Sequence, residues 1–292
     1  MTDRHLRAIL LASPEPLKYS TAAGSDNRLI LIFYAFAREI GPFKRRLKNR
    51  RPLEHRDLRG FRAEVAGTEI AAIATGIGIR RARDAARRAF EVYPDIELAI
   101  GAGIAGALTS GLGPGDLVLA DRVIVHHAAD DEAEHVTAID AEHLSQLGRM
   151  LHGAGLRYSS GAILTSHRVL PGSVEKRRAK ERTGAIAVDM ETASIASEAG
   201  ARGIPFASVR TIIDAADDEV VGAGLADEDG RVSPLAATGH LIRNPGEIFK
   251  LPRMMLNLNR ATRSLADALE VIAWRGEMPP NARGRAAGKN RR

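Results

Sequence analysis

Two carboxylates, Asp189 and Glu191, flank a methionine in the stretch AVDMETASIA, residues 187–196, where an apolar run turns into a predicted helix. Acids at the start of a helix can be surface charges that favour the helix dipole. Acids at the mouth of an apolar core can instead hold a substrate. The residue types alone leave both interpretations open, and the rest of the chain has to distinguish them.

Polar side chains and glycines follow other apolar runs as well. Glu39 comes just after the run RLILIFYAF, and Asp214 ends the run SVRTIID. Arg210 precedes Asp214 by four residues, so in a strand both side chains point to the same face. Glycines end two more runs, TGIG (75–78) and GAGIAG (101–106), and glycine lets backbone N–H groups approach a ligand closely. These positions are candidates for binding and for acid–base chemistry.

Strand-like and helix-like segments alternate along the chain, which predicts a single α/β domain with a mixed, mostly parallel central sheet flanked by helices. Ligands of such sheets bind beyond the carboxyl ends of the strands, where the candidate residues are found. Apolar runs predict strands at 28–36, 68–78, 96–108, 115–127, 159–170, 185–190 and 205–214. Helical patterns cover 37–47, whole or broken near Gly41–Pro42, then 79–93, 140–155, 173–184, 191–203 and most of 245–275.

The composition fits one globular domain. The chain has 292 residues, 45% of them apolar, and no cysteine, which excludes a disulfide framework, a thiolate metal site and a cysteine nucleophile. No apolar run approaches the roughly 20 residues of a membrane span, and the first residues do not form a convincing secretory signal. We expect a cytoplasmic protein with an N-terminal extension over 1–27, the α/β domain over 28–277 and a basic, disordered tail over 278–292.

The formal net charge of +6 does not indicate nucleic-acid binding. The tail carries five basic residues and no acid, so removing it from +6 leaves +1 for the rest of the chain. A second basic cluster at 44–62 is interpreted as a solvated face and loop. Neither segment interleaves aromatic residues with its charge, as a nucleic-acid surface commonly does.

The stretch GAGIAG, residues 101–106, matches the G-x-G-x-x-G pattern of dinucleotide-binding enzymes, which makes an NAD-dependent oxidoreductase an alternative. That motif needs a helix directly after it, because the helix N-terminus holds the pyrophosphate. Here ALTSGLGPGD follows, which is too rich in glycine and proline for a helix. We therefore do not favour the oxidoreductase.

Four motifs occur in order at the ends of predicted strands: TGIG, GAGIAGAL with GDLVLAD, VDMETASIA and VRTIIDAAD. In these motifs the chain resembles the purine nucleoside phosphorylase/nucleosidase superfamily, which includes the methylthioadenosine/adenosylhomocysteine nucleosidases and cleaves the N-glycosidic bond of nucleosides. The resemblance covers about residues 28–214. It implies a purine nucleoside as small-molecule substrate, no metal, no other cofactor, and a homodimer.

The resemblance also implies which residues bind the sugar and which residue protonates the base. It assigns the ribose 2′- and 3′-hydroxyls to Glu191, packing against the sugar to Met190, and protonation of purine N7 to Asp214. A carboxylate suits the first task because it accepts hydrogen bonds from two hydroxyls at once. Arg210 is expected at the substrate site, where it could brace one of the acids. For Asp189, a charge at a helix N-terminus remains an equal alternative.

The nucleophile separates nucleosidases from phosphorylases. In AFAREI, Glu39 matches the glutamate with which nucleosidases of this family activate water. Where the family's phosphorylases carry phosphate-binding side chains, this chain has Gly101 and Ile104. We therefore favour hydrolysis. Phosphorolysis stays the alternative, because Thr75 and the Gly76–Gly78 backbone could bind phosphate or position the water.

Base recognition is expected from the loop SHRVL, with adenine as the favoured base. Three histidines, His126, His127 and His135, have acids between them and could suggest a metal site. We interpret the segment that contains them as a solvated loop. The substrate-binding residues that we expect, beyond Met190, Glu191 and Arg210, are Thr75, Gly76, Gly78, Gly103, Ile104, Val169 and Leu170.

The C-terminal segment 245–275 carries an apolar stripe with Met254, Met255, Leu256 and Leu258 crowded together. Core packing is the first interpretation of this stripe, and a pocket or a membrane-surface contact is the alternative. The ending is similar to hopanoid-associated members of the superfamily, which remove adenine from an adenosylated lipid. A catalytically silent nucleoside-binding module is a further alternative, and it predicts binding without base release.

Overall fold

The computed structural model describes residues 29–126, 133–139, 141–220 and 250–274. The predicted N-terminal extension and basic tail lie outside these residues. The described chain forms one mixed sheet with helices on both faces, which confirms the predicted fold class. The strands are β1 Leu29–Tyr34, β2 Arg51–Pro52, β3 Gly60–Val65, β4 Thr68–Ala74, β5 Ile96–Ala107, β6 Leu117–His126, β7 Ala133–Ala138, β8 Tyr158–Thr165, β9 Ala187–Asp189 and β10 Phe206–Asp214.

The sheet has the strand order β10-β6-β8-β9-β5-β1-β4-β3-β2, with β7 paired to β6. Strands β4, β1, β5 and β10 run parallel to one another, so their carboxyl ends meet at one edge. Strand β10 also pairs with β5, and this extra pairing closes β5, β10, β6, β8 and β9 into a ring. The ends of β5, β9 and β10 therefore lie close together although they are far apart in sequence.

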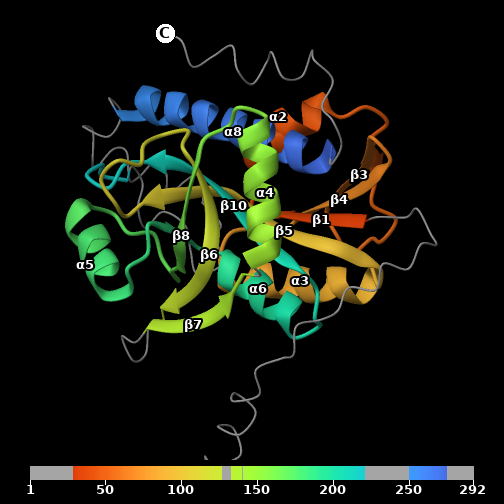
Figure 1. Ribbon diagram of the computed structural model, residues 1–292, viewed down its shortest axis with the longest axis horizontal. Helices are drawn as coiled ribbons and strands as arrows, with labels where there is room; N and C mark the ends of the chain where they lie inside the picture. Colours follow the sequence, from red (N-terminus) through yellow and green to blue (C-terminus); the bar gives the residue numbers. More distant parts are fainter. Residues whose placement is uncertain (1–28, 127–132, 140, 221–249, 275–292) are drawn as a thin grey trace, which may run out of the picture.

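Helices cover the sheet on two sides. In Figure 1, α2 and α8 lie along one face, and α3 and α6 lie along the opposite face. Each side has its own apolar core, and the two cores share the sheet between them. The helices are α2 Ala37–Arg46, α3 Ile79–Val92, α4 Ala141–Gly153, α5 Ser173–Thr183, α6 Thr192–Gly200 and α8 Leu251–Trp274.

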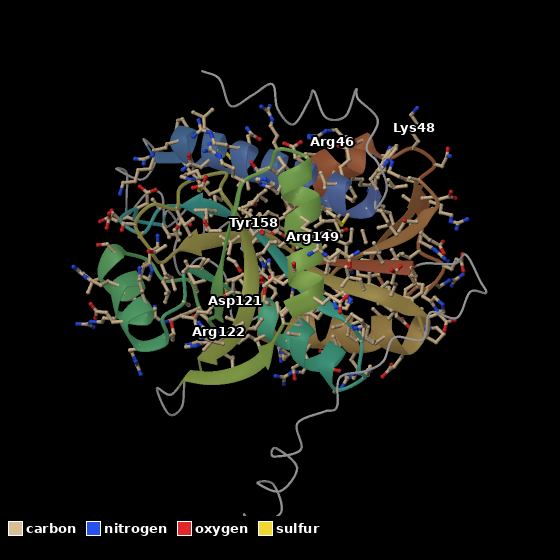
Figure 2. The ribbon with its side chains drawn as sticks, in the orientation of Figure 1. Arg46, Lys48, Asp121, Arg122, Arg149 and Tyr158 are labelled. Carbon is tan, nitrogen blue, oxygen red and sulfur yellow. The ribbon has the colours of Figure 1, made fainter. Side chains whose placement is uncertain are left out.

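The sequence patterns explain these elements. Every residue of β1 (LILIFY) is buried, as expected for a central strand with helices on both faces. In α3, Ala82, Ala86, Ala89 and Phe90 are buried while most of the arginines are not, because they lie on the other side of the helix. On the surface, Arg46 of α2 ties that helix to α8 through two acids of α8 (Figure 2).

One loop prediction was confirmed in part and another was wrong. The basic cluster 44–62 is mostly exposed and mostly outside helices and strands, as predicted, but it also contains the end of α2, β2 and the start of β3, and these strands extend the sheet beyond β4. The histidine-rich segment was also predicted as a loop, yet β7 pairs antiparallel with the end of β6, from Arg122–Ala138 to His126–Ala133. His127 lies outside the described residues. Both strands are short, and their alternation of apolar and polar residues was not recognised. Basic residues surround β3, and β7 contains an acid and a histidine.

Two other details bear on the site. Helix α2 continues through Gly41–Pro42 without a break, so Glu39 lies in the first turn of a whole helix. The stretch GAGIAG lies inside β5 and not at a strand-to-helix turn. The helix N-terminus that a dinucleotide would need is therefore missing after this motif. In the ranges that the structure describes, no helix is long and apolar enough to cross a membrane.

Candidate active site

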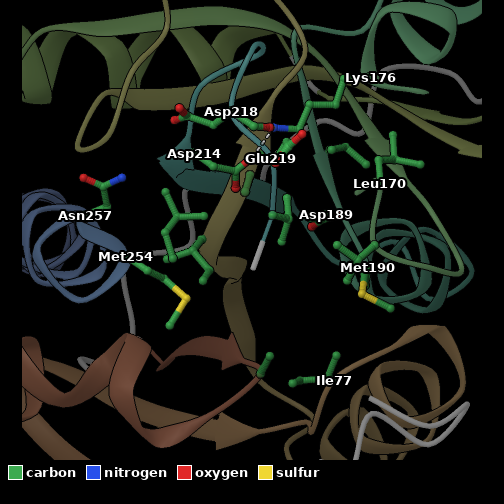
Figure 3. Close-up of a pocket in the computed structure, with 18 of the residues that line it drawn as sticks. Ile77, Leu170, Lys176, Asp189, Met190, Asp214, Asp218, Glu219, Met254 and Asn257 are labelled. Atoms are coloured by element: carbon green, nitrogen blue, oxygen red, sulfur yellow. Dashed lines mark hydrogen bonds and ion pairs between the residues drawn. The ribbon is translucent and has the colours of Figure 1, made fainter. Parts of the chain in front are cut away.

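A cavity of about 600 Å³ opens where the carboxyl ends of β5, β9 and β10 meet the first turn of α2. The two acids predicted to be catalytic, Glu39 and Asp214, and the acid predicted to hold the sugar, Glu191, all line it. Figure 3 shows Asp214 on one side of this cavity, Met190 on another, and Met254 and Asn257 approaching from α8. The fold thus brings together acids that are separated by up to 175 positions in the chain, from 39 to 214.

Glu39 is held by backbone amides. Its Oε2 accepts hydrogen bonds from the N–H groups of Ala35 (2.7 Å) and Phe36 (3.2 Å), and its Oε1 accepts one from Ile104 (3.1 Å). Burial raises the pKa of Glu39 above its ordinary value, although Arg210 and the three amides lower it. A carboxylate fixed in this way, with a raised pKa and a face on the cavity, is suited to take a proton.

Gly103 leaves the space in which Glu39 and Arg210 approach each other. A Cβ atom at position 103 would lie 2.3 Å from Nη1 of Arg210 and 2.8 Å from Oε1 of Glu39. Neither group can move away cheaply, because Glu39 is bound by three amides and Arg210 is buried. Gly103 was predicted to contact the substrate, but it lies behind Glu39 and is not among the residues that line the cavity.

We expect Gly103→Ala to displace Glu39 or Arg210 and to reduce activity sharply. Overpacking at such a position costs about 1–3 kcal/mol of unfolding free energy. The measurements are urea denaturation and the rate of base release from a nucleoside. Gly113→Ala is the control, since a Cβ there meets nothing within 4 Å. Full activity with native stability in Gly103→Ala would contradict the described packing.

Asp189 and Arg210 form a buried ion pair with an N–O distance of 2.6 Å, and their side chains are 0% and 1% exposed. Asp189 also accepts hydrogen bonds from the hydroxyl of Thr165 (2.7 Å) and the N–H of Thr192 (3.1 Å). Arg210 donates to the Thr192 hydroxyl. Asp189 therefore serves the start of α6, the alternative to substrate binding that the sequence left open, and Arg210 braces an acid from behind the cavity.

Removing the charge of Asp189 should destabilise the protein, because Arg210 would be left buried without its partner. We expect Asp189→Asn to lower the free energy of unfolding by about 3–5 kcal/mol, the usual cost of breaking a buried pair. Chemical denaturation measures this, and Asp84→Asn is the control, because it breaks a solvent-accessible pair with Arg87 (3.2 Å) in α3. A loss below about 1 kcal/mol, typical of exposed pairs, would show that the pair is not sealed from water.

Glu191 lies between β9 and α6, where it is 5% exposed and faces the cavity. Its Oε1 accepts a hydrogen bond from the N–H of Gly78 (2.8 Å). Gly78 precedes α3 and has a φ of 99°, a conformation that favours glycine. In this conformation its N–H group points toward Glu191. Burial and the charge of Asp189 raise the pKa of Glu191 to about 8, with a smaller contribution from Glu39.

This raised pKa predicts a pH dependence of stability. The folded protein keeps a proton on Glu191 between its ordinary pKa of 4.5 and about 8, whereas the unfolded chain loses it. The folded state then binds more protons, so the free energy of unfolding falls as pH rises through this window. Glu191→Gln should flatten the slope of stability between pH 5 and pH 8, roughly the window between those values. Urea titrations at several pH values test this, with Glu91→Gln as the control, and equal slopes in both variants would refute it.

Asp214 ends β10 and is paired with Lys176 of α5. Burial raises the pKa of Asp214, Lys176 lowers it, and Asp218 raises it further. Sequence analysis missed Lys176, because a lysine in the highly charged stretch SVEKRRAKERT gives no signal of burial. The side chain is nevertheless 1% exposed and lines the cavity.

The remaining predicted residues divide into two groups. Ile104, Val169, Leu170 and Met190 line the cavity, whereas Thr75, Gly76 and Gly78 are not among the lining residues. The N–H groups of Thr75 and Gly76 donate to the carbonyls of Tyr34 (2.8 Å) and Ala35 (3.1 Å). With the Gly78 amide bound to Glu191, these groups are engaged within the protein and do not form an open anion cradle.

The cationic side chains that line the cavity are all paired with acids. Arg168 binds Glu175 (2.7 Å), Lys176 binds Asp214, Lys250 binds Glu219 (2.6 Å) and Arg253 binds Asp218 (3.0 Å). Seven acidic residues are among those that line the same cavity, although the carboxyl group of Asp189 is itself buried against Arg210: Glu39, Asp189, Glu191, Asp214, Asp217, Asp218 and Glu219. No three acids or histidines of the described ranges gather in a way that could hold a metal ion.

Comparisons with known proteins identify the family of this chain. The family described as the Phosphorylase superfamily matches residues 29–238. The chain belongs to the phosphorylase superfamily. This membership confirms the family that the four motifs predicted, and with it the expectation of an enzyme that is a nucleosidase or a nucleoside phosphorylase. It also leaves the oxidoreductase alternative without support.

Curated relatives in this superfamily are nucleosidases by name. A 5′-methylthioadenosine/S-adenosylhomocysteine nucleosidase of Chromohalobacter salexigens is 30% identical over 206 residues, which cover 66% of this chain and 86% of the relative. The same enzyme of Actinobacillus succinogenes is 30% identical over 189 residues, covering 61% of this chain and 79% of that relative.

Solved structures share this fold. The 5′-methylthioadenosine/S-adenosylhomocysteine nucleosidase of S. pneumoniae, solved with a transition-state inhibitor, has a TM-score of 0.65 at 19% identity and covers 84% of this chain and 98% of its own. The futalosine hydrolase of Helicobacter pylori has a TM-score of 0.63 at 17% identity and covers 84% of this chain and 97% of its own. At these identities the likeness concerns the fold alone.

Proposed function

We propose that this protein hydrolyses the N-glycosidic bond of an adenine nucleoside, with water as the nucleophile. Both named relatives are nucleosidases that act on adenine nucleosides, which supports the reaction class. The three acids on one cavity supply the groups that such a reaction needs. Breaking the bond leaves a positive charge on the sugar and a negative charge on the base, so a carboxylate is useful on one side and an acid on the other.

Each acid has a task in this proposal. Glu191, ionised when it binds, accepts hydrogen bonds from the ribose 2′- and 3′-hydroxyls, and Met190 packs against the sugar. Glu39, held by its three backbone amides, accepts a proton from the water that attacks the anomeric carbon. Asp214, on the opposite side of the sugar, protonates purine N7 as the bond to the sugar breaks. Val169 and Leu170 contact the base.

The pairing of the cationic side chains in the cavity carries the proposal of hydrolysis over phosphorolysis. A phosphate group needs unpaired cations or free backbone amides. Among the described lining residues there are four cations, and each of them already pairs with an acid. A phosphate group would find no unpaired cation among these described lining residues, whereas a neutral water molecule needs none.

The proposal is tested by mixing the purified protein with adenosine, 5′-methylthioadenosine, S-adenosylhomocysteine and inosine in phosphate-free buffer. The expected result is release of adenine from at least one adenine nucleoside, and less or no hypoxanthine from inosine. A strict requirement for phosphate would favour a phosphorylase instead. Binding of these nucleosides without any base release would favour the silent binding module.

We further propose that the substrate has a large apolar 5′-substituent, of which an adenosylated hopanoid is one candidate. The cavity extends to α8, where Met254 and Asn257 approach it, and Phe36 and Ile77 add apolar surface. About 600 Å³ lies within the range of pockets that bury ligands of drug-like size. Rates should then rise with the length of an apolar 5′ group, and a substrate preference confined to adenosine would contradict this.

We also propose a homodimer, as the resemblance to the superfamily implies, and a location in the cytoplasm, as the composition suggests. Light scattering coupled to size-exclusion chromatography of the full chain measures the oligomeric state. The expected mass is twice the 31.4 kDa of one chain, and a monomeric mass at working concentrations would refute the dimer.

A further inference from the structure

Lys176 is a buried cation that belongs to none of the motifs found in the sequence. It lies in the first turn of α5, at the position four residues after Gly172, and its side chain is 1% exposed. Figure 3 shows its ammonium group reaching across to Asp214 at one end of the cavity, with Asp218 and Glu219 nearby. A buried lysine is costly unless it is paired, so its presence here calls for a reason.

All three protons of the ammonium group are used. Lys176 donates to Oδ2 of Asp214, to the carbonyl of Ala215 (2.7 Å) and to the carbonyl of Asp218 (3.1 Å). These acceptors belong to the end of β10 and to the loop that follows it. Lys176 therefore fixes the Asp214 carboxyl group and the loop next to it as one unit.

The loop after β10 is also stabilised by hydrogen bonds between its own residues. Oδ2 of Asp218 accepts a hydrogen bond from the N–H of Ala215 (2.9 Å), and the N–H of Asp218 donates to the carbonyl of Ala215 (3.1 Å). The charged groups that face Asp214 are Lys176 from α5 and Asp218 from this loop, and Arg253 of α8 pairs with Asp218. Oδ1 of Asp214 has no hydrogen-bond partner among the described residues, so it is the oxygen available to a ligand.

We propose that Lys176 is a positioning residue that holds the carboxyl group of Asp214 in the orientation from which it protonates the departing purine. The inference rests on the proposed function and deepens it by naming the group that controls the acid. As the bond from the anomeric carbon to purine N9 breaks, its electron pair goes to the purine, and the proton of Asp214 moves to N7. Lys176 keeps its own protons and stabilises the carboxylate that remains.

This role predicts that Lys176 matters only where the leaving group needs a proton. Lys176→Met should lower kcat for the best adenine nucleoside by about 10- to 100-fold, part of the 10²–10⁴ typical of general-acid catalysis, with little change in KM. The 4-nitrophenyl riboside with the same 5′ group leaves without protonation and should be cleaved at close to the wild-type rate. Lys180→Met, one turn further along α5 and away from the cavity, is the matched control.

Two more measurements separate positioning from structural support. If Lys176 acts through Asp214, the double variant Lys176→Met/Asp214→Asn should be no slower than Asp214→Asn alone. Because Lys176 lowers the pKa of Asp214, its removal should also move the alkaline limb of the kcat/KM profile to higher pH. Lys176→Arg, which keeps the positive charge, should restore part of kcat.

Each outcome decides something. Equal losses of Lys176→Met on the adenine nucleoside and on the nitrophenyl riboside would overturn the inference and leave the proposed function intact. Multiplicative losses in the double variant would do the same. A wild-type protein that releases no base from any adenine nucleoside would overturn both. Selective loss on the adenine nucleoside, with non-additivity and the shifted limb, supports the inference.

Discussion

The substitution Glu39→Gln should abolish most base release and leave nucleoside binding close to that of the wild type. An amide cannot accept the proton of the attacking water, and loss of a general base typically costs about 10²–10⁴ in rate. Glutamine has nearly the same shape, so the sugar and base contacts on the far side of the cavity should persist. The measurements are single-turnover base release and equilibrium binding of the same nucleoside.

Glutamine at position 39 should also cost stability, and this has to be separated from the kinetic effect. Both carboxylate oxygens of Glu39 accept from backbone N–H groups, so either orientation of an amide places its NH₂ group against a donor. Glu91→Gln on the exposed side of α3 is the control for the substitution itself. Unchanged turnover in Glu39→Gln would reject this residue as the base, whatever its effect on stability.

The second large effect is expected for Asp214→Asn. This variant should lose about 10²–10⁴ in kcat on adenine nucleosides, because asparagine has no acidic proton for purine N7. Lys176 can still donate to the amide oxygen, so the fold should be retained. The rate on a nitrophenyl riboside should change little, since that leaving group departs without a proton.

The ratio of the two rates is the informative quantity for Asp214. Comparing adenine and nitrophenyl release within one preparation cancels any loss of folded protein. Asp84→Asn, at a solvent-accessible position of α3 and not among the residues that line the cavity, should leave both rates unchanged. If Asp214→Asn slows both substrates alike, Asp214 holds the site together and does not act as the acid. If it slows neither, another acid of the following loop performs this step.

The sequence predicted the positions of the acids because their placement follows from topology. In a sheet whose central strands run parallel, residues just beyond the carboxyl ends share one edge. Glu39, Glu191 and Asp214 each follow or end a recognisable apolar run, so their convergence on one cavity required only the strand assignments. The periodicity of the apolar runs and of α3 was strong enough for those assignments.

The sequence could not predict which polar groups form hydrogen bonds or ion pairs with one another inside the protein. Thr75, Gly76 and Gly78 were predicted to bind the substrate, with phosphate binding by their amides as an alternative, yet each amide donates to a carbonyl or a carboxylate of the protein. Their partners lie 41 or more positions away, and no local pattern indicates them. The burial of Lys176 and the Asp189–Arg210 pair depend on the same long-range packing.

Gly103 is a further position where the sequence did not identify the interacting group. The glycine-rich stretch suggested close approach of a ligand, which is a common reason for glycine. The group that approaches is instead the Arg210 guanidinium from the neighbouring strand β10, together with Glu39. A glycine in a strand indicates that something comes close, and only the three-dimensional structure identifies it.

The most direct test of hydrolysis is a competition between water and phosphate within one reaction. The purified protein is mixed with 5′-methylthioadenosine and an excess of radiolabelled inorganic phosphate, and the sugar product is identified. We predict one reducing sugar for each adenine released, no label in the sugar, and a rate that phosphate does not increase. A labelled sugar 1-phosphate, formed in proportion to adenine, would contradict the proposal that Glu39 activates water in this cavity.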